Sequence, residues 1–180
     1  NHIIDKDEED RRLKALAEYR ILGTEPESCY DDITQIAART CHVPISLMTL
    51  VDKDRQWFKS KVGFQTNETR RDWSFCTHAI KENVPLIVND AFLDERFVNN
   101  PLVTGDPKIR FYAGFPLKTN DGNKLGTLCV IDRKPGKLNS EQRSIMELLA
   151  KQIVSFLDLR KRSLNLLDAL SHLHHQEGIL

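Results

Sequence analysis

Apolar residues recur at helical spacing near the start of the chain. Between residues 7 and 22 acidic side chains crowd the first turn, where the helix dipole favours negative charge, and an apolar stripe follows them. The stripe consists of Leu13, Leu16, Ala17, Ile21 and Leu22. Gly23 predicts the end of this helix. A second helix is predicted from about Tyr30 to Cys41, with Pro44 beyond its end.

After Pro44 the apolar period shortens from about 3.6 to 2, which indicates strands. Residues 45–52 and 56–62 predict an antiparallel hairpin, and residues 74–83 a short helix. Residues 85–89 predict a short strand, and residues 109–119 and 124–132 predict a second hairpin across an Asn-Asp-Gly turn. Residues 90–108, rich in Asp, Asn, Pro and Gly, form a connection long enough to suggest function.

A long helix is predicted at the C-terminus. Asn139 followed by Gln142 is a capping-box pattern, and the helical spacing continues past residue 170. A heptad seam places Leu149, Phe156, Ser163 and Leu170 at position a and Gln152, Leu159, Leu166 and Leu173 at position d. The members of this heptad series that precede Leu159 either contact a partner helix or pack on the sheet of their own domain. Beyond Arg160 a partner helix is favoured, and we expect a parallel homodimer.

Composition bounds the class of protein. The chain has 180 residues, of which 40% are hydrophobic, so one domain with appendages is expected. Lys plus Arg (26) equals Asp plus Glu (26), which disfavours nucleic acid or an anionic membrane as a partner. No apolar run spans a membrane and the start is highly charged, so we expect a cytoplasmic location. The chain begins without Met and stops within a helical pattern, as expected for part of a longer protein.

Four cysteines, Cys29, Cys41, Cys76 and Cys129, are spread without a CxxC pair, which predicts reduced thiols. Cys76 and His78 lie two apart in a predicted helix and point in different directions, so no shared metal is expected. A thiolate nucleophile at Cys76 and a packed cysteine both stay open. The His172, His174 and His175 group is typical of a solvated helix face. We expect no metal and no cofactor.

Three motifs carry a resemblance. SFCTHAI at residues 74–80, DERFVNNPLVTGDPKIRFYAGFPL at 94–117 and GTLCVID at 126–132 resemble a bacterial GAF domain of sensor histidine kinases and cyclic-dinucleotide signalling enzymes. The resemblance covers roughly residues 28–160. It implies an α+β fold, with terminal helices on one face of a six-stranded antiparallel sheet and a small-molecule pocket under short helices and loops on the other. Residues 1–27 are then an N-terminal helix and linker, and residues 161–180 begin a signalling helix leading to an output domain.

The pocket is predicted between the sheet and residues 74–109. Its expected ligand-binding residues are Phe75, Cys76, His78, Asp90, Tyr112 and Gly114. Arg96 and Arg110 are candidates for a phosphate fork or for pairing with nearby carboxylates.

The leading hypothesis is a non-catalytic sensory module that binds an unidentified small molecule and relays a signal through its C-terminal helix. The alternatives are a cysteine-dependent enzyme or bilin photosensor using Cys76, and a purely structural dimerisation domain.

Overall fold

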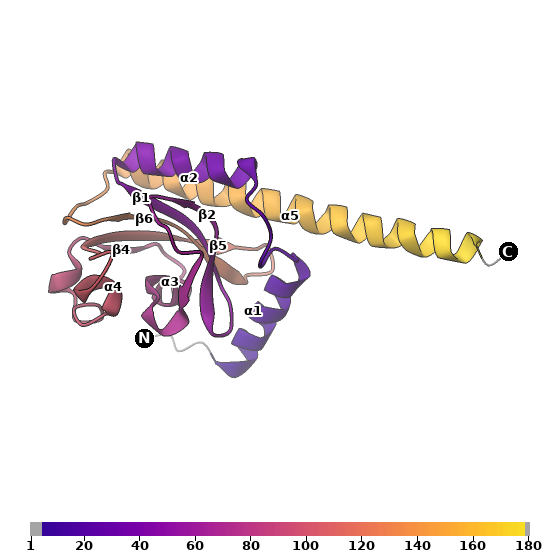
Figure 1. The fold of residues 1–180 in the computed structure, drawn as a ribbon, viewed down its shortest axis with the longest axis horizontal. Coiled ribbons are helices and arrows are strands. Elements are labelled where there is room, and N and C mark those ends of the chain that lie inside the picture. Colours follow the sequence, from indigo (N-terminus) through magenta and orange to yellow (C-terminus); the bar gives the residue numbers. More distant parts are fainter. Residues whose placement is uncertain (1–4, 179–180) are drawn as a thin grey trace.

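The computed structural model describes residues 5–178, which form a sheet with helices on both faces (Figure 1). The longer helices are α1 (Lys6–Glu18), α2 (Ser28–Cys41) and α5 (Ser140–Glu177). The strands are β1 (Ile45–Val51), β2 (Arg55–Val62), β3 (Glu68–Arg70), β4 (Leu86–Val88), β5 (Phe111–Lys118) and β6 (Lys124–Asp132). The short helices are η1 (Arg71–Trp73), α3 (Phe75–Ala79), η2 (Ala91–Leu93) and α4 (Pro101–Thr104).

The six strands form one antiparallel sheet in the order β3-β2-β1-β6-β5-β4, which confirms the expected fold class. Both predicted hairpins are present, and β1 and β6 join them at the centre. The sixth strand, β3, is only three residues long and lies at an edge, so its pattern is too short to identify from the sequence.

The two faces of the sheet carry different covers. We call the face under α2 and α5 the helix face, and the face under the short helices the loop face (Figure 1). Alternation along the strands sends Trp57 and Phe111 into the helix-face core and Phe58 and Tyr112 into the loop-face core. All seven residues of β1 are buried, because both faces above this strand are covered.

Two helices end earlier than the sequence predicts. α1 stops at Glu18 rather than near residue 22, because Arg20 takes a left-handed conformation (φ 48°) that lets Tyr19 and Ile21 enter the core. α3 spans Phe75–Ala79 rather than residues 74–83. Its start is capped by Ser74, whose hydroxyl accepts a hydrogen bond from the Thr77 amide.

The C-terminal helix begins as predicted. The Asn139 side chain accepts from the Gln142 amide, and the Gln142 side chain accepts from the Asn139 amide, which completes the capping box. The first half of α5 packs on the helix face through Met146, Ala150, Ile153 and Leu157. The second half extends beyond the sheet (Figure 1).

Candidate functional site

The predicted pocket on the loop face is almost filled by aromatic rings. Phe75 stacks on Phe97 with ring centroids 4.1 Å apart and planes at 9°, and it also lies 5.0 Å from the Tyr112 ring. The space left among Phe75, Cys76 and Tyr112 is a cavity of about 20 Å³. Such a volume has room for about one water molecule. A larger ligand on this face therefore needs the short helices to move.

Cys76 lies at the floor of this cavity in a fully buried network. Its sulfur lies 3.2 Å from the Tyr112 hydroxyl and accepts a hydrogen bond from Thr127 Oγ1 at 3.1 Å. The Thr127 hydroxyl in turn lies 3.0 Å from that of Thr49. The network joins α3 to the central strands, so these polar atoms hold the short helices against the sheet.

The thiols of Cys76 and Cys129 differ in acidity although both are buried. Burial raises the pKa of Cys76, but hydrogen bonds to its sulfur, led by those from Cys129 and Thr127, outweigh burial and lower it. Burial raises the pKa of Cys129 well above its ordinary value, and neighbouring Cys76 raises it further.

The other predicted site residues divide by position. His78 is half-buried and packs its ring edge against Phe97, with centroids 4.9 Å apart. Burial, chiefly, lowers the His78 pKa. Among the described residues no hydrogen bond joins His78 to Cys76. Asp90 lies outside the cavity lining and caps η2 by accepting from the Phe92 amide at 3.0 Å.

Gly114 lies where the Tyr112 side chain comes close to the backbone of β5. A Cβ atom there would lie 2.2 Å from the Tyr112 hydroxyl, so only glycine lets the tyrosine side chain fold over this point of β5. Phe75, Cys76 and Gly114 thus meet around the Tyr112 side chain, whereas His78 packs against Phe97 and Asp90 lies apart, so the six predicted residues do not line one open pocket.

The two candidate arginines of the long connection have protein partners. Arg96 donates to both carboxylate oxygens of Asp94, at 2.9 and 2.6 Å, and hydrogen bonds from Arg96 lower the pKa of Asp94. Arg110 donates to the carbonyls of Val103 and Ile109 and lies 3.5 Å from the Phe92 ring centroid. Of the two alternatives, pairing with a nearby carboxylate is therefore the one that Arg96 follows.

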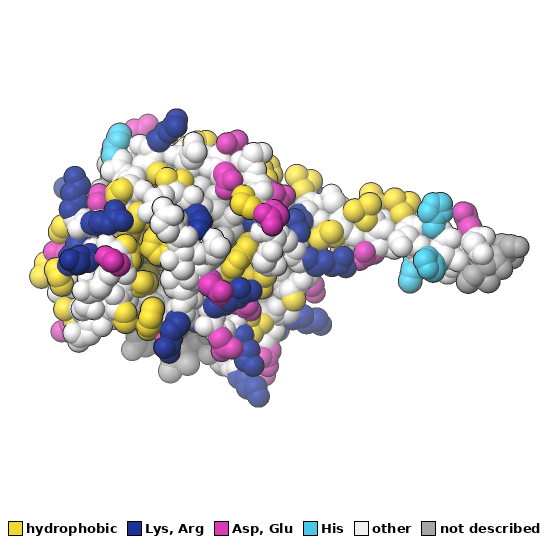
Figure 2. All heavy atoms as spheres, in the orientation of Figure 1, with side chains coloured by type: hydrophobic (Ala, Val, Ile, Leu, Met, Phe, Trp, Pro, Cys, Tyr) yellow, Lys and Arg dark blue, Asp and Glu magenta, His cyan; other side chains and the backbone are white. Residues whose placement is uncertain are grey.

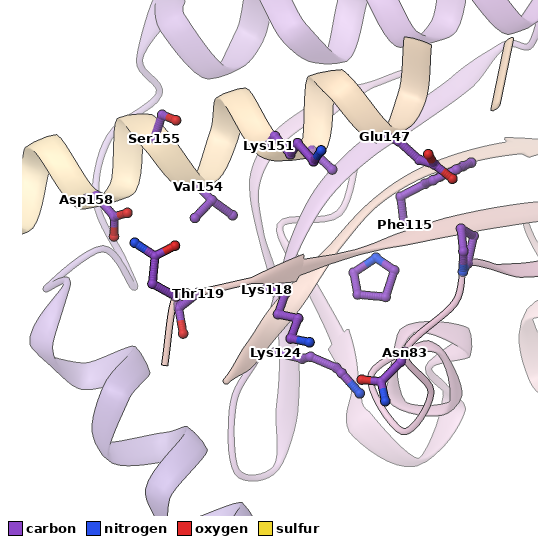
Figure 3. Close-up of a pocket in the computed structure, with 14 residues that line it drawn as sticks. Asn83, Phe115, Lys118, Thr119, Lys124, Glu147, Lys151, Val154, Ser155 and Asp158 are labelled. Atoms are coloured by element: carbon purple, nitrogen blue, oxygen red, sulfur yellow. The ribbon is translucent and has the colours of Figure 1, made fainter. Parts of the chain in front are cut away.

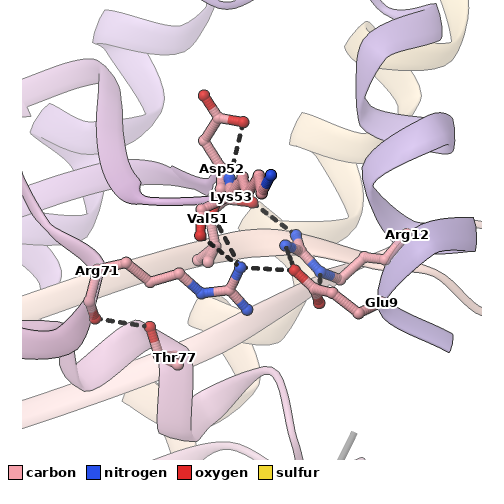
Figure 4. Close-up of polar contacts among 7 residues, drawn as sticks. All are labelled: Glu9, Arg12, Val51, Asp52, Lys53, Arg71 and Thr77. Atoms are coloured by element: carbon pink, nitrogen blue, oxygen red, sulfur yellow. Dashed lines mark hydrogen bonds and ion pairs between the residues drawn. The ribbon is translucent and has the colours of Figure 1, made fainter. Parts of the chain in front are cut away.

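A charged cluster that sequence reasoning missed lies at the N-terminal end of α1 (Figure 4). Arg12 is only 3% exposed and donates to the Val51 carbonyl at 2.6 Å. It also donates two hydrogen bonds of 2.9 Å to the Glu9 carboxylate. Arg71, from η1, donates to the same carboxylate and to the Asp52 carbonyl. The carbonyl of Arg71 accepts from Thr77 on α3 at 3.1 Å.

This arrangement perturbs the Glu9 carboxyl group. Burial raises its pKa, but hydrogen bonds and charges of Arg12 and Arg71 outweigh burial and lower the pKa to about 2. Glu9 thus stays ionised and joins α1 to the short helices of the loop face.

The C-terminal end of α1 holds α5 by a second set of polar contacts. Arg160 donates to the carbonyls of Tyr19 and Arg20, both at 2.8 Å, and the Tyr19 hydroxyl donates to Asp158 at 3.2 Å. Lys161 pairs with Glu18 at 2.8 Å. We call this set the α1–α5 contact. It shows that α5 remains attached to its own domain at residues 158–161.

A second, wider cavity lies alongside α5, away from the predicted pocket. It runs between residues 115–124 of the β5–β6 hairpin and residues 147–158 of α5, and we call it the α5 groove (Figure 3). Its volume is about 690 Å³. No sequence motif marks it, because its lining comes from two hairpin strands and one helix with ordinary surface residues.

Two features are absent from the described part of the chain. Between residues 5 and 178, no three His, Cys, Asp or Glu side chains gather in a way that could hold a metal ion. Over the same residues no helix is long and apolar enough to cross a membrane.

Together the sheet order, the two helical layers and the long C-terminal helix define an α+β domain of the type used in signalling proteins. The GAF domain family matches residues 25–156, and the chain belongs to this family. GAF domains are regulatory domains of signalling proteins. The resemblance drawn from the three motifs is thereby confirmed.

Known proteins extend this assignment. A cyclic di-GMP phosphodiesterase of Pseudomonas aeruginosa is 36% identical over 171 residues, which cover 94% of this chain and 29% of that protein. The chain thus spans less than a third of this relative's length.

Solved structures confirm the fold. A type II free methionine-R-sulfoxide reductase from Thermoplasma acidophilum gives a TM-score of 0.60 at 13% identity, covering 72% of this chain and 90% of that one. A domain of a two-component sensor histidine kinase protein from Sinorhizobium meliloti gives 0.52 at 17% identity, covering 76% and 93%. The blue-light-absorbing PixJ GAF domain from Thermosynechococcus elongatus gives 0.59 at 13%, covering 96% and 98%.

Proposed function

We propose that this GAF domain is a sensory module that binds a small molecule and passes its state to an output domain through a parallel dimer of α5. The observation that carries the proposal is the exposed leucine stripe on the second half of α5. Leu159, Leu166, Leu170 and Leu173 are all more than half exposed, and Figure 2 shows apolar side chains along the protruding helix. In a homodimer this stripe buries apolar surface worth about 1.5–3 kcal/mol per leucine before ordering costs.

The seam supports dimerisation only beyond the domain body. Leu149 is partly buried in the helix-face core, and the Phe156 ring packs edge-on against Tyr30 of α2 at 6.2 Å. These two a positions are therefore occupied within one chain. Ser163 at a leaves a polar gap at the start of the free seam, which keeps the dimer moderately stable and able to shift register or rotation.

The two ends of α1 support a route from the loop face to this seam. In the first turns of α1, Glu9 accepts a hydrogen bond from Arg71, whose carbonyl accepts one from Thr77 of α3. Just after the last turn, the Tyr19 carbonyl accepts from Arg160 and the Tyr19 hydroxyl donates to Asp158, both on α5. A movement of α3 that displaces Arg71 alters the hydrogen bond from Arg71 to Glu9 and so shifts α1. Because α1 moves as one helix, the shift reaches its contacts with α5. Ligand entry on the loop face requires such a movement, because the cavity there is only about 20 Å³.

The buried position of Cys76 supports a packing role over the enzymatic alternative. A nucleophile needs a base within hydrogen-bond reach and access for a substrate. Cys76 instead meets the hydroxyls of Tyr112 and Thr127. Native mass spectrometry of the purified domain, searching for a co-purified small molecule, tests the sensory part of the proposal.

Disulfide cross-linking tests the relay part. Leu166→Cys places a thiol at a d position, where it faces its own copy in a parallel dimer. Asn165→Cys, one residue earlier on the outward side of the seam, is the matched control. We expect mild oxidation to convert Leu166→Cys to a covalent dimer at least tenfold faster than Asn165→Cys.

Equal rates for the two variants would contradict a parallel seam. Cys41, Cys76 and Cys129 are buried, and the partly exposed Cys29 is present in both variants, so its background is the same in each.

A further inference from the structure

Two buried cysteines face the small cavity on the loop face. Cys76 of α3 and Cys129 of β6 both line it, and each is at most 2% exposed. Cys29 and Cys41 lie on the other side of the sheet, in or against the helix-face core. The loop-face cavity therefore brings together two of the four thiols of the chain.

Two separate contacts place the Cys76 sulfur beside Cys129. The sulfur accepts a hydrogen bond from Thr127 Oγ1 at 3.1 Å, and Thr127 precedes Cys129 by two residues on the same face of β6. The sulfur also lies 3.2 Å from the Tyr112 hydroxyl. That hydroxyl lies over Gly114, the residue directly opposite Cys129 in the β5–β6 ladder. The two cysteine side chains are therefore neighbours, as a disulfide requires.

The surroundings of the two thiols favour reaction with a small oxidant. Hydroxyl donors at a sulfur stabilise its thiolate form, which is the form that attacks an oxidant. The cavity of about 20 Å³ has room for about one water molecule. Phe64, Thr69 and Leu102 line both this cavity and a groove of about 530 Å³ beside β3, so they form the wall between the two. Hydrogen peroxide is only one oxygen atom larger than water and needs little movement of this wall.

From this geometry we infer that Cys76 and Cys129 form a dithiol site that hydrogen peroxide oxidises to an intrachain disulfide. One sulfur displaces hydroxide from the peroxide and becomes a sulfenic acid, and the other sulfur then displaces hydroxide from that sulfenic acid. The S–S bond forms as the O–O bond breaks, and the two thiol protons leave in two molecules of water. The two cysteines lose two electrons, which the peroxide gains.

The disulfide would fix α3 to the centre of the sheet. Cys76 lies in the first turn of α3, and β6 lies between β1 and β5. The link would stop α3 from moving away from the sheet, which is the movement that ligand entry on the loop face requires. Oxidation would thus close the domain to its ligand. This consequence rests on the proposed sensory function, whereas the disulfide itself does not.

Peptide mapping tests the inference on the full chain. Reduced protein is treated with hydrogen peroxide under native conditions, the remaining thiols are alkylated after denaturation, and the digest is analysed by mass spectrometry. We expect a linked peptide pair that joins Cys76 to Cys129 and disappears after treatment with dithiothreitol. Oxidised glutathione is too large for the cavity and should modify the partly exposed Cys29 at least about tenfold faster than Cys76.

Cysteine variants supply the matched comparison. Cys129→Ser should abolish the linked pair, whereas Cys41→Ser, which changes a buried thiol in the other core, should keep it. Hydrogen exchange gives a second measurement that needs no variant. Peroxide should slow amide exchange of residues 75–80 about tenfold in the wild-type chain, because the link opposes local opening of α3.

Three results would each overturn the inference. They are a link from Cys76 or Cys129 to a different cysteine, sulfinic acid at Cys76 without a link, and peroxide oxidation confined to Cys29. The site does not depend on dimerisation or on a bound ligand. Its failure therefore leaves the cross-linking of Leu166→Cys and the native mass spectrometry of the reduced domain unaffected.

Discussion

The two halves of α5 use the same kind of residue for opposite purposes. In the first half, Met146, Ile153 and Leu157 are at most 1% exposed and fill the space above the sheet. In the second half, Leu166 is 62% exposed and Leu170 52% exposed, although the helix is continuous. What separates them is the end of the sheet, marked by Arg160 and its hydrogen bonds to the carbonyls of Tyr19 and Arg20.

This contrast teaches that apolar spacing along a helix does not identify what covers it. The buried stripe of the first half and the exposed stripe of the second are offset around the helix. Ile153 lies in the helix-face core, whereas Phe156, which belongs to the same heptad series as the exposed leucines, packs against Tyr30 of α2. A domain and a partner can therefore share one helix without competing for the same side chains.

The largest effect should come from a charge in the first half. Ile153→Asp buries an unpaired carboxylate in the core and should cost about 4 kcal/mol or more, enough to unfold a domain of ordinary stability. Leu170→Asp makes the same chemical change on the second half and should alter the stability of the dilute monomer by less than about 0.5 kcal/mol. Urea denaturation followed by circular dichroism measures both. Similar losses in the two variants would remove the contrast between the halves.

The next effect concerns the hold of α1 on the loop face. Glu9→Gln removes the anion between Arg12 and Arg71 and should cost about 1–3 kcal/mol at neutral pH, less than a fully buried pair because Glu9 is 21% exposed.

The pH dependence follows from the direction of the Glu9 pKa shift. Its pKa is lowered from 4.5 to about 2, so its contribution to stability is complete above about 4.5 and is lost as the pH falls toward 2. Urea midpoints measured at steps of pH should fall less steeply for Glu9→Gln than for wild type in this window. Glu95→Gln, at an exposed acid, is the control and should keep the wild-type slope. A wild-type slope in Glu9→Gln would show that the cluster contributes nothing.

A smaller effect is expected at the boundary between the halves. Arg160→Met keeps the alkyl stem but removes hydrogen bonds to the carbonyls of Tyr19 and Arg20, which should cost about 1–2 kcal/mol. Hydrogen exchange of residues 6–18 should accelerate, because the C-terminal end of α1 is released. Arg162→Met, at an exposed position without such contacts, should exchange as wild type does. Unchanged exchange in Arg160→Met would mean that α1 is held elsewhere.

The smallest effect is expected far from α5. In Cys76→Ser the new hydroxyl keeps polar partners in Tyr112 and Thr127, so the change should cost less than about 1 kcal/mol and leave α5 unaffected. Thermal melting measures this cost. Loss of a co-purified molecule or of an activity in this variant would instead favour the cysteine-dependent alternative.

Local rules were sufficient for much of the fold. The Asn139–Gln142 capping box, the turn after Thr119 and the alternation of Phe111 and Tyr112 each depend on neighbouring residues, and the structure contains all three. The end of α1 was misplaced because Tyr19 is buried in the core, which is a tertiary effect that local spacing does not contain.

The site was less predictable for a physical reason. The motifs indicated which residues gather near Tyr112, but not that Phe97 would stack on Phe75 and fill the space between them. Similarly, Lys118 and Lys124 are ordinary hairpin residues in the sequence, and only the strand register places them opposite each other. Volume and charge at a site depend on packing between distant segments.

The central claim is that the second half of α5 is an interface. Light scattering during size exclusion, at tens of micromolar protein, should be compared for the full chain and for a truncation ending at Arg162, which keeps the α1–α5 contact. We predict a dimer for the full chain and a monomer for the truncation. A monomeric full chain, or a truncation that dimerises equally tightly, would contradict the claim.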